Sequence, residues 1–181
     1  MTTFSSLIRQ ILNSSSKNLI TIKDEINLLT SYLELEKMRY KGKFDYTITL
    51  NERIFPEKIY LPIMLIQPYV ENAINHGLRF LKDRPGQLNI SFDRKDDNTI
   101  ICTIDDNGIG FRASQERKSV SDKSHISAGI QITRNRIDTL NVIYGKSIKV
   151  DFVDKAEENA NVSGVIVTIS LPIIDQNIIG V

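Results

Sequence analysis

The sequence predicts an α/β (α+β) fold, a two-layer sandwich in which helices cover one face of a mixed, mostly antiparallel sheet. Several short segments alternate apolar and polar residues, which is typical of half-buried strands. Two of them, 87–94 and 98–105, are separated only by Lys95-Asp-Asp-Asn98, which indicates a hairpin. Longer segments carry apolar residues at helical spacing, and the first of these predict a helical segment at the N-terminus.

Composition limits the classes of protein to consider. The 181 residues are enough for one domain with a real core. A net charge of +1 gives no support for a nucleic-acid partner. No segment approaches the ~20 apolar residues of a membrane-spanning helix, and no signal peptide is present, so we expect a cytoplasmic chain. The single cysteine, Cys102, lies in an apolar run and is expected to be a buried, reduced thiol.

The N-terminal 40 residues are expected to form helices. An apolar stripe marks residues 4–12, and a second helix is predicted from Thr21 to Tyr40. Thr21 and Asp24 suggest an N-terminal cap, and Gly42 suggests a left-handed residue after the helix. These helices either offer a surface to a partner or pack on the same domain.

The rest of the chain predicts the sandwich itself. Alternation from Phe44 to Leu50 predicts a strand, and the apolar spacing in 128–144 predicts a helix. Two further strands are expected at 147–153 and 165–171, separated by a polar loop. The remaining helix, 61–76, is the one that carries polar residues of chemical interest.

This helix would have an unusual polar face. At about 100° per residue, two amides, a carboxylate and an imidazole fall within an arc of roughly 140°: Glu71, Asn72, Asn75 and His76. Oxygen ligands of this kind suit Mg²⁺, which keeps waters and binds through phosphates. Pro68 is expected to kink the helix or to free a carbonyl. A solvated polar face would give the same pattern.

A second polar motif follows the strand that ends near residue 105. In Asp106-Asn-Gly-Ile-Gly110, the glycines permit positive φ and close approach of a flat ligand. The carboxylate of Asp106 could accept a hydrogen bond from an exocyclic amine such as that of adenine, although a simple turn would show the same residues. The phosphate-binding loop with Gly-Lys-Ser/Thr and the dinucleotide fingerprint are both absent from the sequence.

The two motifs together resemble the ATP-binding domain of the GHKL superfamily, which includes gyrase, the Hsp90 chaperone, histidine kinases and the MutL protein. The likeness is narrower to the catalytic domain of LytS-type sensor histidine kinases. Val70-Glu-Asn-Ala-Ile-Asn-His-Gly77 is similar to that group's Asn box, and Ile104-Asp-Asp-Asn-Gly-Ile-Gly-Phe111 to its first glycine box. The resemblance implies two regions, a segment 1–40 that matches the end of the dimerisation domain and its linker, and a catalytic domain over 41–175.

The resemblance also implies a binding site for ATP and Mg²⁺. Asn72 would hold the metal, surrounded by Glu71, Asn75 and His76 as catalytic residues. Asp106 would bind the adenine amine, with Gly108 and Gly110 against the base. Residues 112–127 would form a mobile lid. Within the lid, Lys118 or Lys123 would contact phosphate, and residues after the lid would supply the remaining nucleotide contacts: Gly129, Arg134 and Arg136. The two arginines would equally suit a solvated helix face.

By resemblance, the domain would pass the γ-phosphoryl of ATP to a histidine on a dimerisation domain, for relay to a response regulator. The parent would be a homodimer in the bacterial inner membrane. Two features depart from the family pattern. The second glycine box reads Ser127-Ala-Gly129, with one glycine lost, and the acceptor motif His-Phe-x-Phe-Asn is absent. We therefore expect a fragment that begins after the acceptor helix, or a protein that lost it, without autophosphorylation of its own.

Two other readings fit the sequence. One is a GHKL hydrolase or serine kinase, but relatives of that kind place an acidic base four residues before the metal-binding Asn, where this chain has Pro68. The other is a degenerate, non-catalytic module for nucleotide sensing or dimerisation, which the lost glycine and the missing acceptor favour.

Overall fold

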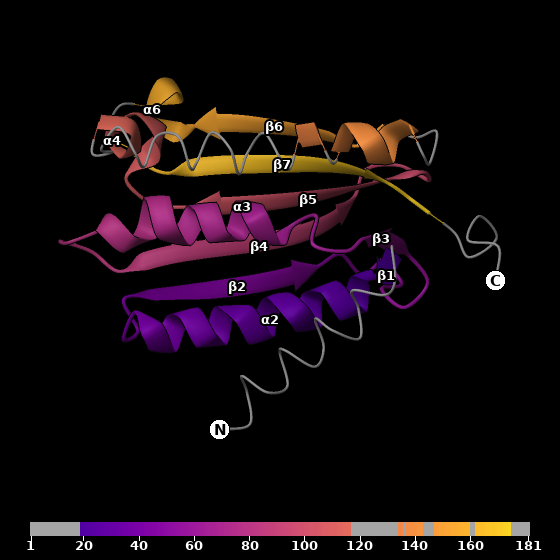
Figure 1. The fold of residues 1–181 in the computed structure, drawn as a ribbon, viewed down its shortest axis with the longest axis horizontal. Coiled ribbons are helices and arrows are strands. Elements are labelled where there is room, and N and C mark those ends of the chain that lie inside the picture. Colours follow the sequence, from indigo (N-terminus) through magenta and orange to yellow (C-terminus); the bar gives the residue numbers. More distant parts are fainter. Residues whose placement is uncertain (1–18, 117–133, 136, 143–146, 160–161, 175–181) are drawn as a thin grey trace.

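A computed structural model describes residues 19–116, 134–135, 137–142, 147–159 and 162–174. Within these ranges, one five-stranded sheet has the order β2-β4-β5-β7-β6 (Figure 1). The pair β2–β4 is parallel and the other pairs are antiparallel. This arrangement confirms the mixed, mostly antiparallel sheet predicted from the sequence. The strands are β2 (Phe44–Leu50), β4 (Gly86–Arg94), β5 (Thr99–Asp106), β6 (Lys149–Asp154) and β7 (Val165–Pro172).

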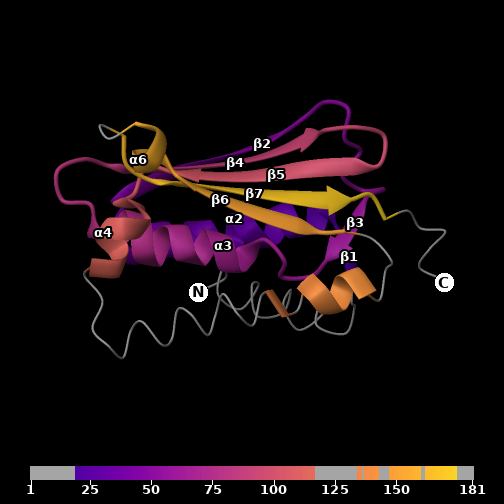
Figure 2. The ribbon, with the colours of Figure 1, turned by 90° about the horizontal axis from the view of Figure 1, so that it is seen from above.

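Helices α2 (Ile22–Arg39) and α3 (Gln67–Asn72) lie on the same face of this sheet (Figure 2). Side chains that point from the strands toward these helices are buried, and alternate side chains on the opposite face are largely polar. Leu88, Ile90 and Phe92 of β4 are all fully buried in this way. The core thus lies between the sheet and the helical layer, as the two-layer prediction requires.

Helix α2 begins where the sequence predicts. The Thr21 hydroxyl accepts a hydrogen bond from the Asp24 amide (3.1 Å) and caps the helix. After the helix, Lys41 already has a positive φ of 54° and Gly42 one of 69°, so the left-handed turn starts one residue before the glycine. Leu29 and Leu33 of α2 are buried in the common core. Of the two alternatives for this helix, packing on the same domain is the one observed.

The predicted helix 61–76 begins too early. Tyr60–Pro62 is strand β3, which pairs with β1 (Leu19–Thr21) in a small antiparallel sheet. Helix α3 starts only at Gln67 and continues as a π-helical turn, η1 (Ala73–Gly77), and a 3₁₀ turn, η2 (Leu78–Phe80). Pro68 lies in the first turn of α3, where a backbone amide has no intrahelical partner, so of its two predicted effects the kink is not observed.

Three further segments complete the described fold. The predicted loop after β6 contains a short helix, α6 (Lys155–Glu158). Helix α4 (Gly110–Glu116) begins inside the glycine motif. Residues 134–135 and 137–142 are helical, as predicted, whereas the expected helix at 4–12 lies outside the described residues. Cys102 is buried and free, and in the described part of the chain no helix has the length and apolar character to cross a membrane.

Candidate functional site

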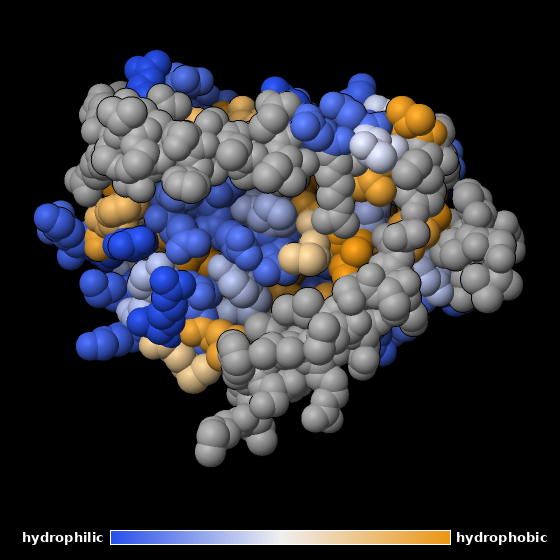
Figure 3. Space-filling model, viewed as in Figure 1, coloured by the Kyte–Doolittle hydropathy of each residue, from blue (hydrophilic) through white to orange (hydrophobic). Residues whose placement is uncertain are grey.

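A cavity opens between the α3–η1 segment, the start of α4 and the ends of β5, β6 and β7. It brings together two motifs that lie about 30 residues apart in the sequence, because Asn72 and His76 line it from one side and Asp106 and Gly110 from the other. On the face drawn in Figure 3, hydrophilic residues gather over α3, and hydrophobic residues appear toward the end of the molecule that holds β1 and β3.

Asp106 is the buried acceptor of this cavity. It is the last residue of β5 and only 3% exposed, and its Oδ1 accepts a hydrogen bond from the Gly108 amide (2.7 Å). Burial raises the pKa of the Asp106 carboxyl to about 6, although the Gly108 amide and the charge of Lys155 act in the opposite direction. The carboxyl is therefore ionised at neutral pH and able to accept a hydrogen bond from a ligand amine.

The glycines allow the two motifs to touch. A Cβ on Gly108 would lie 2.5 Å from the Cα of Gly77, closer than any real side chain could be placed. A Cβ on Gly77 would in turn lie 3.0 Å from the Oδ1 of Asp106. Gly77 was not among the predicted site residues, although it ends the Asn box. The sequence did offer a signal for Gly77, because each of the two motifs that were expected to meet contains a glycine.

The predicted polar arc divides into two faces. Asn72 and His76 line the cavity, but Glu71 and Asn75 are not among its lining residues. Glu71 accepts a hydrogen bond from Gln67 Nε2 (2.9 Å), and Asn75 Oδ1 accepts one from the hydroxyl of Tyr40 at the end of α2 (3.0 Å). Neighbouring helical residues point about 100° apart, so a four-residue arc is too wide to face one cavity. The catalytic roles of Glu71 and Asn75 remain predictions.

Comparisons of the sequence and of the fold with known proteins all find histidine kinases. A family model described as "Histidine kinase" matches residues 1–44. The sensor histidine kinase/phosphatase LytS of Staphylococcus aureus (strain MRSA252) is 27% identical over 157 residues, which covers 82% of this chain. The chain is thus similar to a sensor histidine kinase over most of its length. It spans about a quarter of the length of LytS, 25%, so it corresponds to one region of that protein.

Solved structures that include histidine kinases share the fold. The mycobacterial kinase MprB superposes with a TM-score of 0.55 at 17% identity, covering 87% of this chain and 98% of that one. The catalytic domain of the histidine kinase ThkA gives a TM-score of 0.52 at 12% identity, with 87% and 97% covered. Full-length ShkA, solved in complex with AMPPNP, gives 0.55 at 15% identity and covers 94% of this chain and 36% of that one.

The cavity also has an apolar wall that the sequence did not reveal. The Tyr69 and Phe152 rings lie against each other at its edge, with centroids 5.8 Å apart. Val165 and Val167 of β7 line it further in. Such walls suit a flat, weakly polar ligand group. Tyr69 could have been found from its spacing, because it precedes Asn72 by three positions and His76 by seven.

Ser114 of α4 adds a polar group without a partner. It is 6% exposed and lines the cavity, and its hydroxyl has no hydrogen-bond partner among the described residues. Buried polar atoms are nearly always satisfied, so an unsatisfied one in a cavity indicates a ligand or water.

The cation-rich part of the predicted site is only partly described. Arg134 is exposed, and its charge partly opposes the burial that raises the pKa of Tyr69, a residue that lines the cavity. Lys118, Lys123, Gly129 and Arg136 lie outside the described residues. Their roles therefore stay predictions from the resemblance.

The residues present fit a magnesium ion that arrives with its nucleotide. Among the described residues, no group of three or more His, Cys, Asp or Glu side chains could hold a metal. A divalent ion at Asn72 would therefore need phosphate oxygens and waters for most of its ligands. Mg²⁺ is commonly bound in this way.

Proposed function

We propose that this chain is the ATP-binding catalytic region of a two-component sensor histidine kinase. The proposal depends most on one observation: a single cavity joins a buried carboxylate acceptor, Asp106, to a cavity-lining amide, Asn72, along an apolar wall. The relationship to LytS and the shared fold support the same assignment.

In this proposal, each part of the cavity meets one part of ATP. The adenine base lies against the apolar wall and donates its amine hydrogen to Asp106. The phosphates extend toward Asn72 and His76, where Mg²⁺ would neutralise developing charge during transfer. Ser114 lies on the cavity side of α4 and is placed to donate its hydroxyl to the nucleotide. The chain thus supplies position and electrostatic stabilisation, which phosphoryl transfer mostly requires.

The partners follow from the same proposal. The γ-phosphoryl would pass to a histidine on a dimerisation segment and then to a response regulator. Residues 1–44, which match the histidine kinase model, would connect the catalytic region to that segment. A parent homodimer anchored in a membrane belongs to the proposal as well.

Calorimetry with Mg²⁺-ADP and Mg²⁺-ATP provides the first test. We expect binding that Asp106→Asn abolishes or weakens at least tenfold, because the NH2 group that replaces one carboxylate oxygen donates and cannot accept a hydrogen bond. Asp93→Asn, on the exposed face of β4, is the matched control and should bind as the wild type does. Absence of binding at millimolar nucleotide would reject the proposal and favour a non-catalytic interaction module.

The metal role of Asn72 needs a separate comparison. Asn72→Ala should weaken ADP binding in Mg²⁺ but not in the presence of a chelator, since only the metal-dependent part is lost. It should also reduce phosphotransfer to a supplied dimerisation fragment that carries the acceptor histidine. An equal loss of affinity with and without Mg²⁺ would remove the metal role from Asn72.

A further inference from the structure

We propose that Asp154, Lys155, Ser163 and Gly164 form a clamp that positions the glycine motif and thereby sets nucleotide affinity. These four residues flank the connection between β6 and β7, and none of them lines the cavity. They act through Asp106, Gly108 and the start of α4 and are positioning residues. The proposal deepens the nucleotide-binding function and rests on it.

Lys155 holds the end of β5. Its ammonium group donates a hydrogen bond to the backbone carbonyl of Asp106 (2.8 Å) and forms an ion pair with the carboxylate of Asp105. The Lys155 side chain is only 17% exposed, so water does not compete freely for these contacts. The backbone of the proposed adenine-binding aspartate is therefore fixed through its carbonyl group.

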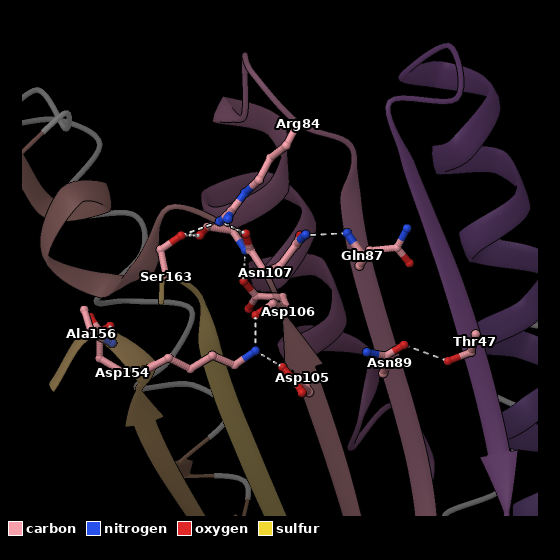
Figure 4. A network of polar contacts seen from close by, with 12 residues as sticks. Thr47, Arg84, Gln87, Asn89, Asp105, Asp106, Asn107, Asp154, Ala156 and Ser163 are labelled. Carbon is pink, nitrogen blue, oxygen red and sulfur yellow. Dashed lines mark hydrogen bonds and ion pairs between the residues drawn. The ribbon is translucent and has the colours of Figure 1, made fainter. Parts of the chain in front are cut away.

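Ser163 and Gly164 hold the next residues of the same turn. The Ser163 hydroxyl donates to the carbonyl of Gly108 (2.7 Å), and Arg84 donates both to Ser163 and to the carbonyl of Asn107 (Figure 4). Gly164 has a φ of +126°, and a Cβ there would lie 2.0 Å from the Asp106 carbonyl oxygen. Glycine alone permits the two segments to come this close.

Asp154 fixes the start of α4, which forms one side of the cavity. Its Oδ2 accepts a hydrogen bond from the Phe111 amide (2.8 Å), and its Oδ1 accepts one from the Ala156 amide (3.1 Å). The residue is 8% exposed. It satisfies backbone donors at the starts of both α4 and α6, which helix ends otherwise leave without a partner. Phe111 in turn lines the cavity.

Together, residues that flank the β6–β7 connection fix the backbone around the cavity at three points, Asp106, Gly108 and Phe111. Binding sites function when their groups are held within about 0.5 Å of the productive position. Removing a contact of the clamp should therefore weaken nucleotide binding without removing any group that touches the nucleotide.

Calorimetry on charge-removing variants tests this. Lys155→Met should bind Mg²⁺-ADP about tenfold more weakly, and Lys155→Arg, which keeps a donor and a charge, should restore most of the affinity. Lys149→Met removes an exposed lysine from β6, the strand that directly precedes Lys155, and should bind as the wild type does. If Lys155→Met does not fold, Ser163→Ala, which removes only a hydroxyl, replaces it. Unchanged affinity in the folded clamp variants would overturn the proposal.

Hydrogen exchange of the nucleotide-free chain provides an independent readout. Asp154→Ala should speed exchange at the Phe111 amide selectively, whereas Asp151→Ala, an exposed residue of the same strand, should not. Faster exchange throughout the chain would indicate general destabilisation and count against the clamp. If the wild type binds no nucleotide, the proposed function fails, but the exchange at Phe111 still decides whether the clamp exists.

Discussion

At the scale of single residues, Asp106 combines burial with a need for charge. In the proposed site, the carboxyl accepts the hydrogen bond from the base most strongly when it is ionised, yet burial favours its neutral form. The pKa of about 6 leaves it ionised at neutral pH, though closer to protonation than an exposed aspartate. Two predictions follow from this balance, one for binding and one for stability.

Nucleotide affinity should fall as the pH is lowered through about 6, where Asp106 takes up a proton. Titration with adenosine measures this without a contribution from phosphate protonation. The affinity should change little between pH 8 and 7 and decrease several-fold by pH 5. A flat profile over this range would show that the carboxylate does not accept a hydrogen bond from the base.

The nucleotide-free Asp106→Asn variant should be at least as stable as the wild type at pH 7. The folded-state pKa lies above the value of 3.8 expected without burial, so ionisation of Asp106 opposes folding at neutral pH. This penalty appears as the pH rises from about 4 to 6 and is absent below that window. Urea unfolding should therefore show any advantage of the variant at pH 7 and lose it near pH 4.

Gly108→Ala should disrupt the junction of the two motifs. The added methyl group meets the backbone of Gly77, and relief of such overpacking typically costs about 1–3 kcal/mol. Gly42→Ala is the matched control, because its Cβ would meet nothing within 4 Å and only its φ of +69° is unfavourable. Both variants should lose stability in urea unfolding, but only Gly108→Ala should lose nucleotide binding in calorimetry.

The sequence was informative at positions where only a few residue types could serve the predicted binding site. Asp106, Gly110 and Asn72 could be predicted as neighbours from two motifs, and the structure places all three at one cavity. The direction of Glu71 and Asn75 could not be predicted, because it depends on where the helix begins and on the π-helical turn. The clamp contact of Asp154 is equally hidden, since it joins residues more than 40 positions apart.

At the scale of elements, η1 couples the binding site to α2. A π-helical turn is rare and often lies at functional sites. Here it follows directly after Asn72, and its Asn75 accepts the hydrogen bond from Tyr40 at the end of α2. The segment that carries the metal-binding candidate is thus attached to the helix that leads back toward residues 1–18.

Tyr40→Phe should cost about 1 kcal/mol of unfolding free energy, the usual net value of one hydrogen bond. Asn75→Ala should cost a similar amount, and the double variant should lose less than the sum if the two side chains act as a pair. Tyr46→Phe removes a comparable bond between α2 and β2, to Glu34, and serves as the control. Additive losses for Tyr40 and Asn75 would show that this contact does not connect the two elements in solution.

Element boundaries were predictable where local signals exist. Thr21 and Asp24 marked the start of α2, and the alternation of β2 and the β4–β5 hairpin was clear. The start of α3 was not, because the apolar run Leu61–Ile66 suits a strand as well as a helix. Strand β3 exists through its pairing with Leu19–Thr21, about 40 residues earlier, which no local pattern encodes.

At the scale of the whole molecule, nucleotide binding should stabilise the fold. Mg²⁺-ADP at 100 times its dissociation constant should raise the unfolding free energy by about 2.7 kcal/mol, because it binds only the folded chain. A thermal melt should show the full rise for the wild type and a clearly smaller one, or none, for Asp106→Asn. A rise of equal size in that variant would place the nucleotide at another site.

The fold class could be predicted from the balance of strands and helices and from the hairpin. The strand order could not, because hydrophobic alternation is the same for parallel and antiparallel partners. The parallel pair β2–β4 follows from the crossover through α3, which returns the chain to the same end of the sheet. The strand order is therefore determined by the packing of the whole chain and not by any local pattern.

This parallel pair has a consequence for the order of folding. The β4–β5 hairpin closes over four intervening residues, but Phe44 meets Gly86 only after 42 positions, and Asp105 meets Ile166 after 61. Contacts distant in sequence form late, because the loops between them must close first. Asn72 lies in the crossover, and Gly164 stands just before β7. A nascent chain therefore displays both signature motifs well before the proposed nucleotide cavity is complete, because β7, the last of the described strands, supplies part of its wall.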